Sequence, residues 1–460
     1  MTSVFAQRAS YRRQGIRFDG GPLPFSAELK VSGALGHKLA RDHVFVGDQG
    51  SDFIGTWRGS RVQLYAVSRR AIEAIVNPKI AGRFIDRDTA ARYSFGQLSP
   101  EAITFASSRN PGFKDRKRNL VVATSSRYAE TATLRALDQQ LGALAGPAFL
   151  DLRPVITACV RDAVAEAMWG EAALELVPYL DGRGDQQMLT FAEAMYDNFL
   201  RLRKFASHYA MRVEPRLQRI AFSREQRSMR ANIAVLQQHM SVMATTPLDG
   251  TVAGHIRRLH GISGFHADIV RDDTSTSFVA AVDTTRTAIL ATLKYLLDPK
   301  NARWKERVTA VLPESAGESA VLRACIMEAL RVDTPGSVFN GRVTEDFDIE
   351  FDGESVRLLR NTLVMANIHA LHASYGATFD PGRLLTKHSD VPLVMPFGKG
   401  PRSCPGKAFA LSMIAVYVNA FLDKFPDAQS DPAQLDNRYP IHTSSEHGFH
   451  VSLNSDRNSS

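Results

Sequence analysis

The chain has 460 residues, of which 44% are apolar and 23% are charged, and its formal net charge at pH 7 is +8. This length and apolar content exclude a disordered chain and allow one large domain or two to three ordinary ones. Charges of both signs are interspersed, and the main basic run, 114–118, accompanies no nucleic-acid recognition motif, so we expect no nucleic-acid partner.

Cysteine usage and hydropathy favour a reducing compartment and no membrane span. The three cysteines are widely spaced, which excludes a disulfide framework and a zinc knuckle. The N-terminal stretch lacks the apolar region of a signal peptide, and the most apolar segment, 408–422, is shorter than the roughly 18 residues that a membrane span needs. We therefore expect a cytoplasmic protein in which 408–422 is a buried helix.

In chain order, the first 45 residues read as a partly irregular N-terminal segment, followed by a single domain over 46–460. Residues 53–66 have strand character, and Ser68 is placed to cap the helix that follows them. From about 115 to 330, apolar residues recur at three- and four-residue spacing. This spacing predicts an overwhelmingly helical body.

Strands return in 346–367, where Asp352-Gly353 signals a hairpin turn, and the tail, 439–453, has the pattern of another hairpin. A large helical body with small sheet regions early and late in the chain is neither a βαβ repeat nor a simple bundle. The fold class we expect is therefore mainly α with small β-sheets.

The sequence PFGKGPRSCPG, residues 396–406, places a cysteine in a glycine- and proline-rich loop ahead of the apolar helix. Pro405 suits the first position of a helix, which would make Cys404 a cap residue at the positive end of the helix dipole and favour its thiolate. Such a thiolate can be a nucleophile, a zinc ligand or a heme-iron ligand. No further Cys or His at short spacing supports zinc. Heme ligation accounts together for the glycines, the proline and Arg402, because a heme propionate needs a cation.

These residues resemble the cysteine-loop signature of the cytochrome P-450 family, F-x-x-G-x-R-x-C-x-G, at every fixed position. The resemblance implies that Cys404 ligates the iron of heme b. It also implies that Phe397, Gly398 and Gly406 border the heme and that Arg402 faces a propionate.

Residues 278–297 belong to a long helix that is predicted to begin at about Asp273, with a polar cluster, Asp283-Thr284-Thr285, in its middle. The Thr284 hydroxyl can turn back to the carbonyl of Ala280, four residues earlier. The alternative is a polar stripe that faces neighbouring helices. The segment is similar to the family's A-G-x-(D/E)-T-T, with Ala281 in place of the glycine. The resemblance implies that Ala280 and Ala281 lie on the heme face, where Asp283 and Thr284 organise water and deliver protons.

Glu328 and Arg331 lie three residues apart on an amphipathic helix predicted over 320–335. On residues alone they read as an exposed ion pair worth a few tenths of a kcal/mol. They also resemble the family's E-x-x-R motif, and FDPGRLL, residues 379–385, resembles its F-x-P-x-R stretch. The resemblance implies a buried structural triad of Glu328, Arg331 and Arg383.

Further positions follow from the resemblance with less direct motif support. Arg342 lies where the family places a second propionate-binding arginine, and Phe113 and Lys117 fall where it usually has a Trp or His and an Arg. Because phenylalanine cannot hydrogen-bond a propionate, the resemblance implies that this contact is either lost or taken by Lys117 or Arg118. The histidines of HALH, His369 and His372, lack a third ligand and are expected to be structural.

As a whole, the resemblance implies one triangular-prism-like domain that acts as a heme-thiolate monooxygenase on a small, mostly apolar substrate in specialised metabolism. Electrons would come from NAD(P)H through an external partner, either a ferredoxin with its reductase or a diflavin reductase. Two alternatives stay open: oxidative coupling or cyclisation at the same centre, and a heme-free homologue that serves as a partner subunit. The family places the substrate pocket at segments that here contain Phe95, Phe105, Phe278, Val282, Val338, Phe339 and Ser445.

Overall fold

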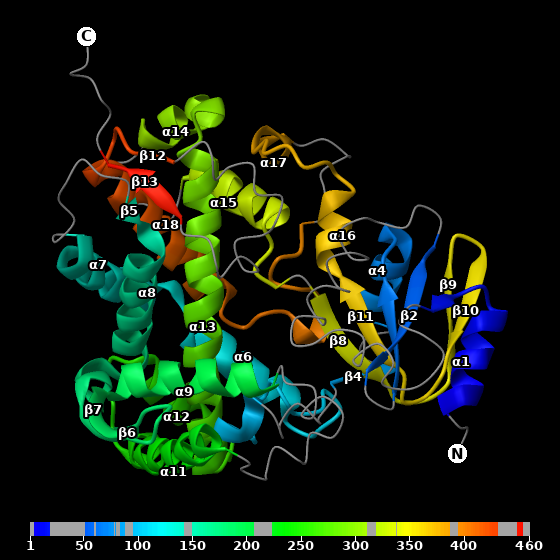
Figure 1. Ribbon diagram of the computed structural model, residues 1–460, viewed down its shortest axis with the longest axis horizontal. Coiled ribbons are helices and arrows are strands. Elements are labelled where there is room, and N and C mark those ends of the chain that lie inside the picture. The colour runs from blue at the N-terminus through cyan, green and yellow to red at the C-terminus, as the bar shows by residue number, and fades with distance from the viewer. Residues whose placement is uncertain are drawn as a thin grey trace.

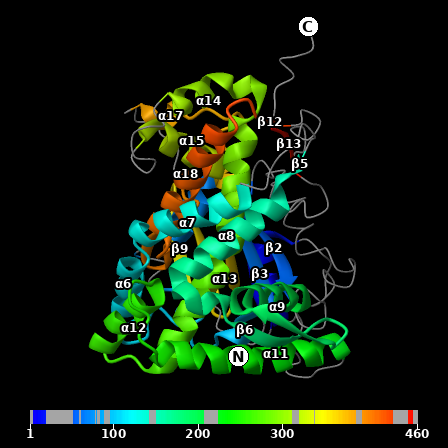
Figure 2. The ribbon, with the colours of Figure 1, turned by 90° about the vertical axis from the view of Figure 1, so that its left-hand side faces the viewer.

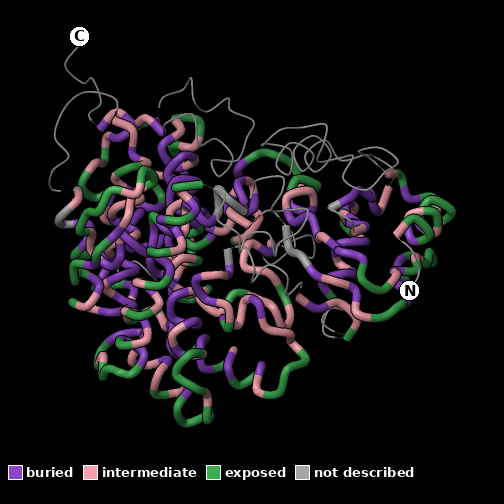
Figure 3. Tube along the Cα trace, turned by 60° about the horizontal axis from the view of Figure 1, so that its bottom comes forward, coloured by how far each residue is buried: buried purple, intermediate pink, exposed green. Residues whose placement is uncertain are grey.

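The computed structural model describes residues 4–18, 51–58, 61–77, 79, 83–87, 95–141, 150–206, 223–310, 319–336, 338–386, 394–430 and 449–453. Figure 1 shows a large helical part and, beside it, a smaller part built on a β-sheet. Buried segments run through the interior of both parts, and exposed ones lie at the periphery (Figure 3).

The helical part is arranged around α13 (Ala267–Leu296), which runs through its middle in both ribbon views (Figures 1 and 2). Three further helices pack with it in one apolar core: α7 (Ser126–Leu141), α8 (Leu152–Trp169) and α18 (Lys407–Lys424). Because neighbours surround α13, most of its side chains are buried, as expected for a helix that is apolar on several faces.

The remaining helices of this part complete the layer around that core. They are α6 (Phe113–Ala123), α9 (Phe191–Ala206), α11 (Arg224–Thr245), α12 (Val252–Ile262), α14 (Ala302–Thr309), α15 (Ala320–Val332) and α17 (Gly382–Leu385), with 3₁₀ turns η2 (Phe95–Leu98), η3 (Gly170–Leu174), η5 (Pro299–Asn301) and η6 (Gly400–Arg402).

The main sheet has six strands in the order β1-β2-β3-β11-β8-β4. Their bounds are Arg17–Phe18, Phe53–Arg58, Arg61–Ala66, Leu363–Asn367, Val338–Val343 and Ile85–Asp86. The centre is mixed, since β11 runs parallel to β3, with Val364 opposite Leu64, and antiparallel to β8. A second apolar core lies between this sheet, the β9–β10 hairpin (Phe347–Phe351, Glu354–Leu358) and the helices α1 (Val4–Arg13), α4 (Arg69–Val76) and α16 (Ile368–Ala373).

Several sequence predictions are confirmed here. The strands expected within 53–66 and 346–367 are found as β2 and β3 and as β9, β10 and β11. Asp352 and Gly353 turn the β9–β10 hairpin with φ of 50° and 78°. Ser68 caps α4 by accepting a hydrogen bond from the Ala71 amide. The N-terminal residues are more regular than expected, because α1 packs on the sheet and β1 pairs with β2. The domain boundary at residues 45 and 46 stays a prediction, since it falls outside the described residues.

The prediction of an overwhelmingly helical body is wrong over 176–190. This stretch is a hairpin, in which β6 (Leu176–Leu180) pairs with β7 (Gln186–Thr190). The burial of β6 alternates, with Val177 and Tyr179 inward, and the intervening DGRGD segment supplies the turn. Of the tail hairpin expected over 439–453, residues 439–448 lie outside the described part. The described strand β13 (His450–Ser452) pairs with β12 (Gln429–Ser430) and β5 (Leu150–Asp151).

Helix lengths and charges also bear on the expected absence of a membrane span. Within the described part of the chain, no helix combines the length and the apolar character that crossing a bilayer requires.

Candidate active site

The loop that carries Cys404 is held in a tight, specific conformation. The Cys404 amide donates to the carbonyl of Phe397 at 2.8 Å, and the Gly398 amide donates to that of Met395 at 3.1 Å. Gly398 and Gly400 adopt φ of 70° and 71°, which L-amino acids with side chains rarely do. These two glycines are therefore required by the backbone path that presents the thiol.

The helix after the loop begins later than the sequence suggests. Gly406 is the N-cap of α18, so the prediction that Pro405 is the first helical residue is wrong. The backbone of Gly406 has not yet reached helical values, and its carbonyl accepts the first helical hydrogen bond, from Ala410. Cys404 thus lies two residues before the cap, close enough for the Gly406 amide to bond its sulfur.

The thiol of Cys404 is exposed to solvent, yet protein surrounds much of it. Burial raises its pKa, while the Gly406 amide and the charges of Lys117 and Lys407 act in the opposite direction. A β-carbon added at Gly406 would meet no atom within 4 Å, so open space borders the loop beside the thiol. The loop that carries Cys404 therefore borders a space that a ligand can reach.

Lys117, on α6, braces this loop from outside. Its ammonium donates to the Pro401 carbonyl at 2.7 Å and to the Ser403 hydroxyl at 2.9 Å. Burial lowers the pKa of Lys117, and the nearby Cys404 acts against that shift. In the structure the Lys117 ammonium therefore binds the cysteine loop. Its expected contact with a heme propionate stays a prediction.

Arg402 binds protein groups far away in sequence. It donates to the Asp86 carboxylate at 3.0 Å and to the Ala106 carbonyl at 2.5 Å, and its guanidinium lies 4.5 Å from the centre of the Phe113 ring. Burial would raise the pKa of Asp86, but hydrogen bonds from Ser107, Ser108, Arg87 and Arg402 lower it to about 2. Both terminal nitrogens of Arg402 are engaged, and its Nε is buried without a hydrogen-bond partner.

Arg342 lies on β8, where its backbone is opposite Asp86 in the neighbouring strand. Its Nη1 donates to Asn361 at 3.2 Å, and its Nε is buried without a hydrogen-bond partner. The two expected propionate-binding arginines are thus joined through Asp86, and each retains one unsatisfied donor atom.

One face of α13 is exposed although the helix lies in the middle of the molecule. Ala280 and Thr284 are exposed, and the Thr284 hydroxyl donates to the Ala280 carbonyl at 2.7 Å, as the sequence predicts. Ala281, beside them, is partly buried against the core. Asp283 is buried, 2.8 Å from a terminal nitrogen of Arg286.

The expected pocket residues of α13 lie elsewhere on the helix. Phe278 and Val282 are fully buried in the core, and the Phe278 ring packs against Trp169 at 4.9 Å. Residues two apart on a helix lie on nearly opposite sides, so these two cannot share the exposed face of Ala280 and Thr284. Their role as pocket lining stays a prediction.

The other expected pocket residues are only partly described. Phe105 is buried, in the segment after η2. Phe95 lies in η2, and Val338 and Phe339 lie in β8 opposite Asn367 and Ala366, with only their backbone described. Ser445 lies outside the described residues.

Glu328, Arg331 and Arg383 come together behind this site. Arg331 donates two hydrogen bonds of 2.9 Å to Glu328, and the Arg383 Nε lies 3.2 Å from the same carboxylate. Arg331 also donates to the carbonyls of His372 and Gly376. Glu328 and Arg331 are almost fully buried, so they are not the exposed pair that residue spacing alone suggests.

A second buried polar cluster, not predicted from the sequence, holds the segment after η2 against α13. Asp272 and Asp273 accept hydrogen bonds of 2.7 Å from the amides of Glu101 and Ile103. Arg116 binds Asp273 with two further bonds of 2.5 and 2.7 Å. Two adjacent acids at the start of an apolar helix were the available signal, because buried carboxylates require partners.

These features fit a heme group. The thiol of Cys404 is accessible, open space borders Gly406, a face of α13 built from Ala280 and Thr284 is left uncovered, and two arginines retain buried donor atoms without partners. Thiolate is a known heme-iron ligand, and cationic groups suit the propionates. Within the described residues, no cluster of three or more His, Cys, Asp or Glu residues competes as a metal site.

Comparisons with known proteins agree with this class of site. The cytochrome P-450 family model matches residues 132–438. A cytochrome P-450 monooxygenase of Gibberella zeae is 31% identical over 179 residues, which are 35% of this chain and 41% of that protein. The cytochrome P-450 monooxygenase lcsN of Purpureocillium lilacinum is 30% identical over 182 residues, 35% of this chain and 54% of that protein.

A solved structure extends the likeness to the whole fold. A crystal structure of a cytochrome P-450 superposes with a TM-score of 0.64 and 16% sequence identity, covering 85% of this chain and 92% of that one. The chain therefore belongs to the cytochrome P-450 family. Its match spans about two fifths to one half of the curated relatives' length.

Proposed function

We propose that this chain is a heme-thiolate monooxygenase that oxidises a small, mostly apolar organic molecule in specialised metabolism. The observation that carries the proposal is the conformation of the cysteine loop, which presents an accessible Cys404 thiol beside the Gly406 amide and two lysines. When bound, heme b would supply oxygen activation with two electrons and two protons, with thiolate ligation favouring cleavage of the O–O bond.

The chain's own residues would hold the thiolate and the cofactor. Gly398 and Gly400 fix the loop, and Lys117 and Lys407 place positive charge near the sulfur. Arg342 and Arg402 would hold the propionates through the donor atoms that lack a protein partner. Phe397, Gly406, Ala280 and Ala281 would border the porphyrin.

Thr284 and Asp283, on α13, would bind water and deliver protons to the site. Because the Thr284 hydroxyl donates its proton to the Ala280 carbonyl, its lone pairs are left to accept a hydrogen bond from water or from a protonated ligand. Asp283 lies one residue away with Arg286 beside it, so an exchange of its partner would allow it to pass a proton toward Thr284.

Electrons would reach the thiolate side from NAD(P)H through an external protein. Lys399 and Lys407 are exposed on the loop and at the start of α18, and Lys114 and Arg118 are exposed on α6. These cations would attract an acidic partner, whether a ferredoxin with its reductase or a diflavin reductase.

The test is the spectrum of the purified protein loaded with heme. The reduced, CO-bound protein should show the red-shifted Soret band of thiolate ligation, Cys404→Ser should lose it, and Cys159→Ala, at a buried cysteine in α8, should keep it. A Cys404→Ser variant with an unchanged spectrum would refute the ligand assignment, and a chain that binds no heme would instead be a partner subunit. Product analysis with labelled oxygen then separates oxygen insertion from oxidative coupling or cyclisation.

A further inference from the structure

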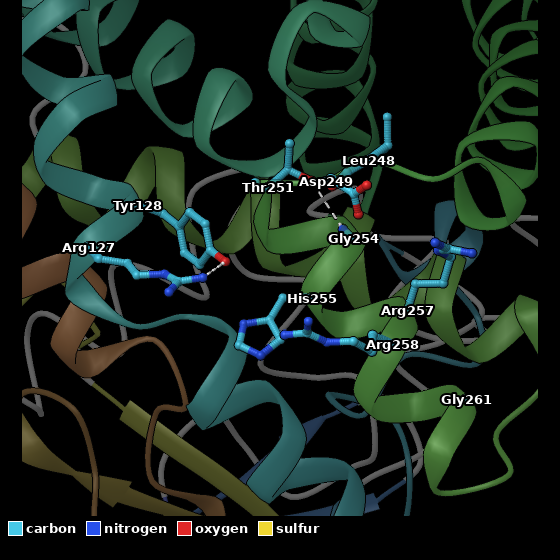
Figure 4. Close-up of a pocket in the computed structure, with 11 residues that line it drawn as sticks. Arg127, Tyr128, Leu248, Asp249, Thr251, Gly254, His255, Arg257, Arg258 and Gly261 are labelled. Atoms are coloured by element: carbon cyan, nitrogen blue, oxygen red, sulfur yellow. Dashed lines mark hydrogen bonds between the residues drawn. The ribbon is translucent and has the colours of Figure 1, made fainter.

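A cavity of about 450 Å³ lies between α7 and α12, among residues that the active site does not use. Arg127 and Tyr128, at the start of α7, form one side, and the turn before α12 and α12 itself, as far as Gly261, supply the rest (Figure 4). Cavities of this size hold small molecules.

The lining of the cavity is strongly positive. It includes Arg127, Arg257 and Arg258, with Asp249 as the one carboxylate among its described lining residues. Arg116, Arg135 and Arg331, elsewhere in the fold, each form an ion pair with Asp or Glu. In the part of the chain that the structure describes, none of the three cavity arginines has a carboxylate within ion-pair distance. Like charges gathered without a counter-ion repel one another, and a bound anion would relieve that repulsion.

His255 reports the positive field inside the cavity. Burial and the charges of Arg258 and Arg127 lower its pKa, so two arginines act on the ring at once. The ring packs edge-on to Tyr128 across the cavity, at 6.3 Å between centres. The side chains that converge here therefore come from two different helices.

The turn before α12 packs tightly on the start of that helix, at the edge of the cavity. The Thr251 hydroxyl caps α12 by accepting from the Gly254 amide at 3.1 Å. A β-carbon at Gly254 would lie 2.0 Å from the Leu248 carbonyl oxygen, so only glycine allows the turn to pack this tightly on the helix. The helix start then adds its partial positive charge to that of the arginines.

We propose that this cavity is a binding site for a small phosphate-bearing anion, distinct from the heme site. Guanidinium groups match the oxygens of phosphate in a two-pronged geometry, and several of them together select a ligand with more than one negative charge. Arg127 and Arg258 would clamp the phosphate oxygens from opposite helices, with the Tyr128 ring beside any organic group that carries the phosphate.

The test uses the full-length protein with its heme, at constant ionic strength, and measures binding of inorganic pyrophosphate and of ADP by calorimetry. We expect saturable binding with one site, weakened tenfold or more in Arg127→Gln and in Arg258→Gln. Arg323→Gln, which removes one exposed charge on α15, is the matched control and should bind as the unmodified protein does.

The two ligands separate the possible sources of the phosphate. Equal affinity for pyrophosphate and ADP means that the site recognises the phosphate groups alone. Tighter binding of ADP means that the Tyr128 side of the cavity also contributes to binding. Both results support the proposal. If Arg323→Gln weakened ligand binding by the same factor, the loss would be due to the overall charge of the protein, and the proposed site would be overturned. Absence of saturable binding, with Arg258→Gln weakening only the binding of an acidic ferredoxin, would make the cluster a protein-docking surface and also overturn it.

Discussion

Single residues of the site differ in how far the sequence alone could place them. The Thr284–Ala280 hydrogen bond was predictable because it joins residues four apart on one helix, where geometry is fixed by the backbone. The role of Cys404 was predictable because the glycines that shape its loop, Gly398 and Gly400, lie in the same short stretch of sequence. The partner of Arg402 was not, since Asp86 is 316 positions away and only the fold brings the two together.

Thr284 offers a prediction about the use of electrons. Thr284→Ala removes the hydroxyl that would accept and relay protons, while Thr284→Ser keeps it. We expect the alanine variant to keep the thiolate spectrum but to form several-fold less product per NAD(P)H consumed, with the serine variant close to the unmodified protein. Unchanged coupling in Thr284→Ala would remove Thr284 from the proton path.

Lys117 offers a second prediction, about the electronics of the thiolate. Lys117→Met removes a positive charge near Cys404 and the hydrogen bonds to Pro401 and Ser403. The reduction potential of the bound heme should shift to more negative values, and the free energy of unfolding should fall by about 1–2 kcal/mol.

The control for Lys117 is on the same helix. Lys114→Met removes an exposed lysine of α6 and should change neither quantity. An equal shift of the potential in both variants would mean that the surface charge of α6 acts as a whole, and that the loop contact of Lys117 has no special role.

At the scale of elements, periodicity predicted the helices better than it predicted their interruptions. The long helix was expected over 273–297 and is observed as α13 from Ala267 to Leu296, because a sustained apolar pattern leaves little choice. The β6–β7 hairpin was missed, since five-residue strands are too short to establish a two-residue period against a helical background. The glycines between them marked the turn but not the strands.

The buried triad on α15 yields a prediction about how elements are joined. Glu328→Gln leaves Arg331 buried without its counter-charge, which should cost about 3–5 kcal/mol of unfolding free energy. Arg383→Gln should cost about 1 kcal/mol or less, because Arg383 is partly exposed and water screens its charge. Denaturant unfolding of the two variants measures both values. Similar losses in both would contradict a role for Glu328 as the buried centre of the triad.

At the scale of the whole molecule, His372 connects the helical part to the cysteine loop. The Met395 amide donates to its Nε2 at 3.0 Å, so the proton is on Nδ1, which donates to the Thr334 hydroxyl at 2.8 Å. The ring thus joins α16 to the end of α15 and to the start of the loop that carries Cys404. The expectation that His369 and His372 are structural agrees with this arrangement.

This connection depends on a neutral ring. Burial, with the charge of Arg331 and His369, lowers the pKa of His372 to about 3, and burial lowers that of His369 to about 4. In the unfolded chain both histidines titrate near pH 6.5, so below that pH the unfolded state binds protons that the folded state does not. The stabilisation is therefore fully present above about pH 6.5 and is lost as the pH falls toward the folded-state values.

We expect the free energy of unfolding to fall by up to about 1.4 kcal/mol per histidine for each pH unit below roughly 6.5. In His372→Gln, the amide can still accept from Met395, but the free energy of unfolding at pH 7 should be lower. Between pH 6 and 5, the slope of that free energy against pH should correspond to about one proton fewer than in the unmodified protein. His266→Gln, at an exposed histidine, should keep the original slope. An unchanged slope in His372→Gln would mean that the ring accepts a proton in the folded protein, and that the bond from the Met395 amide is not what holds the cysteine loop to the helical part.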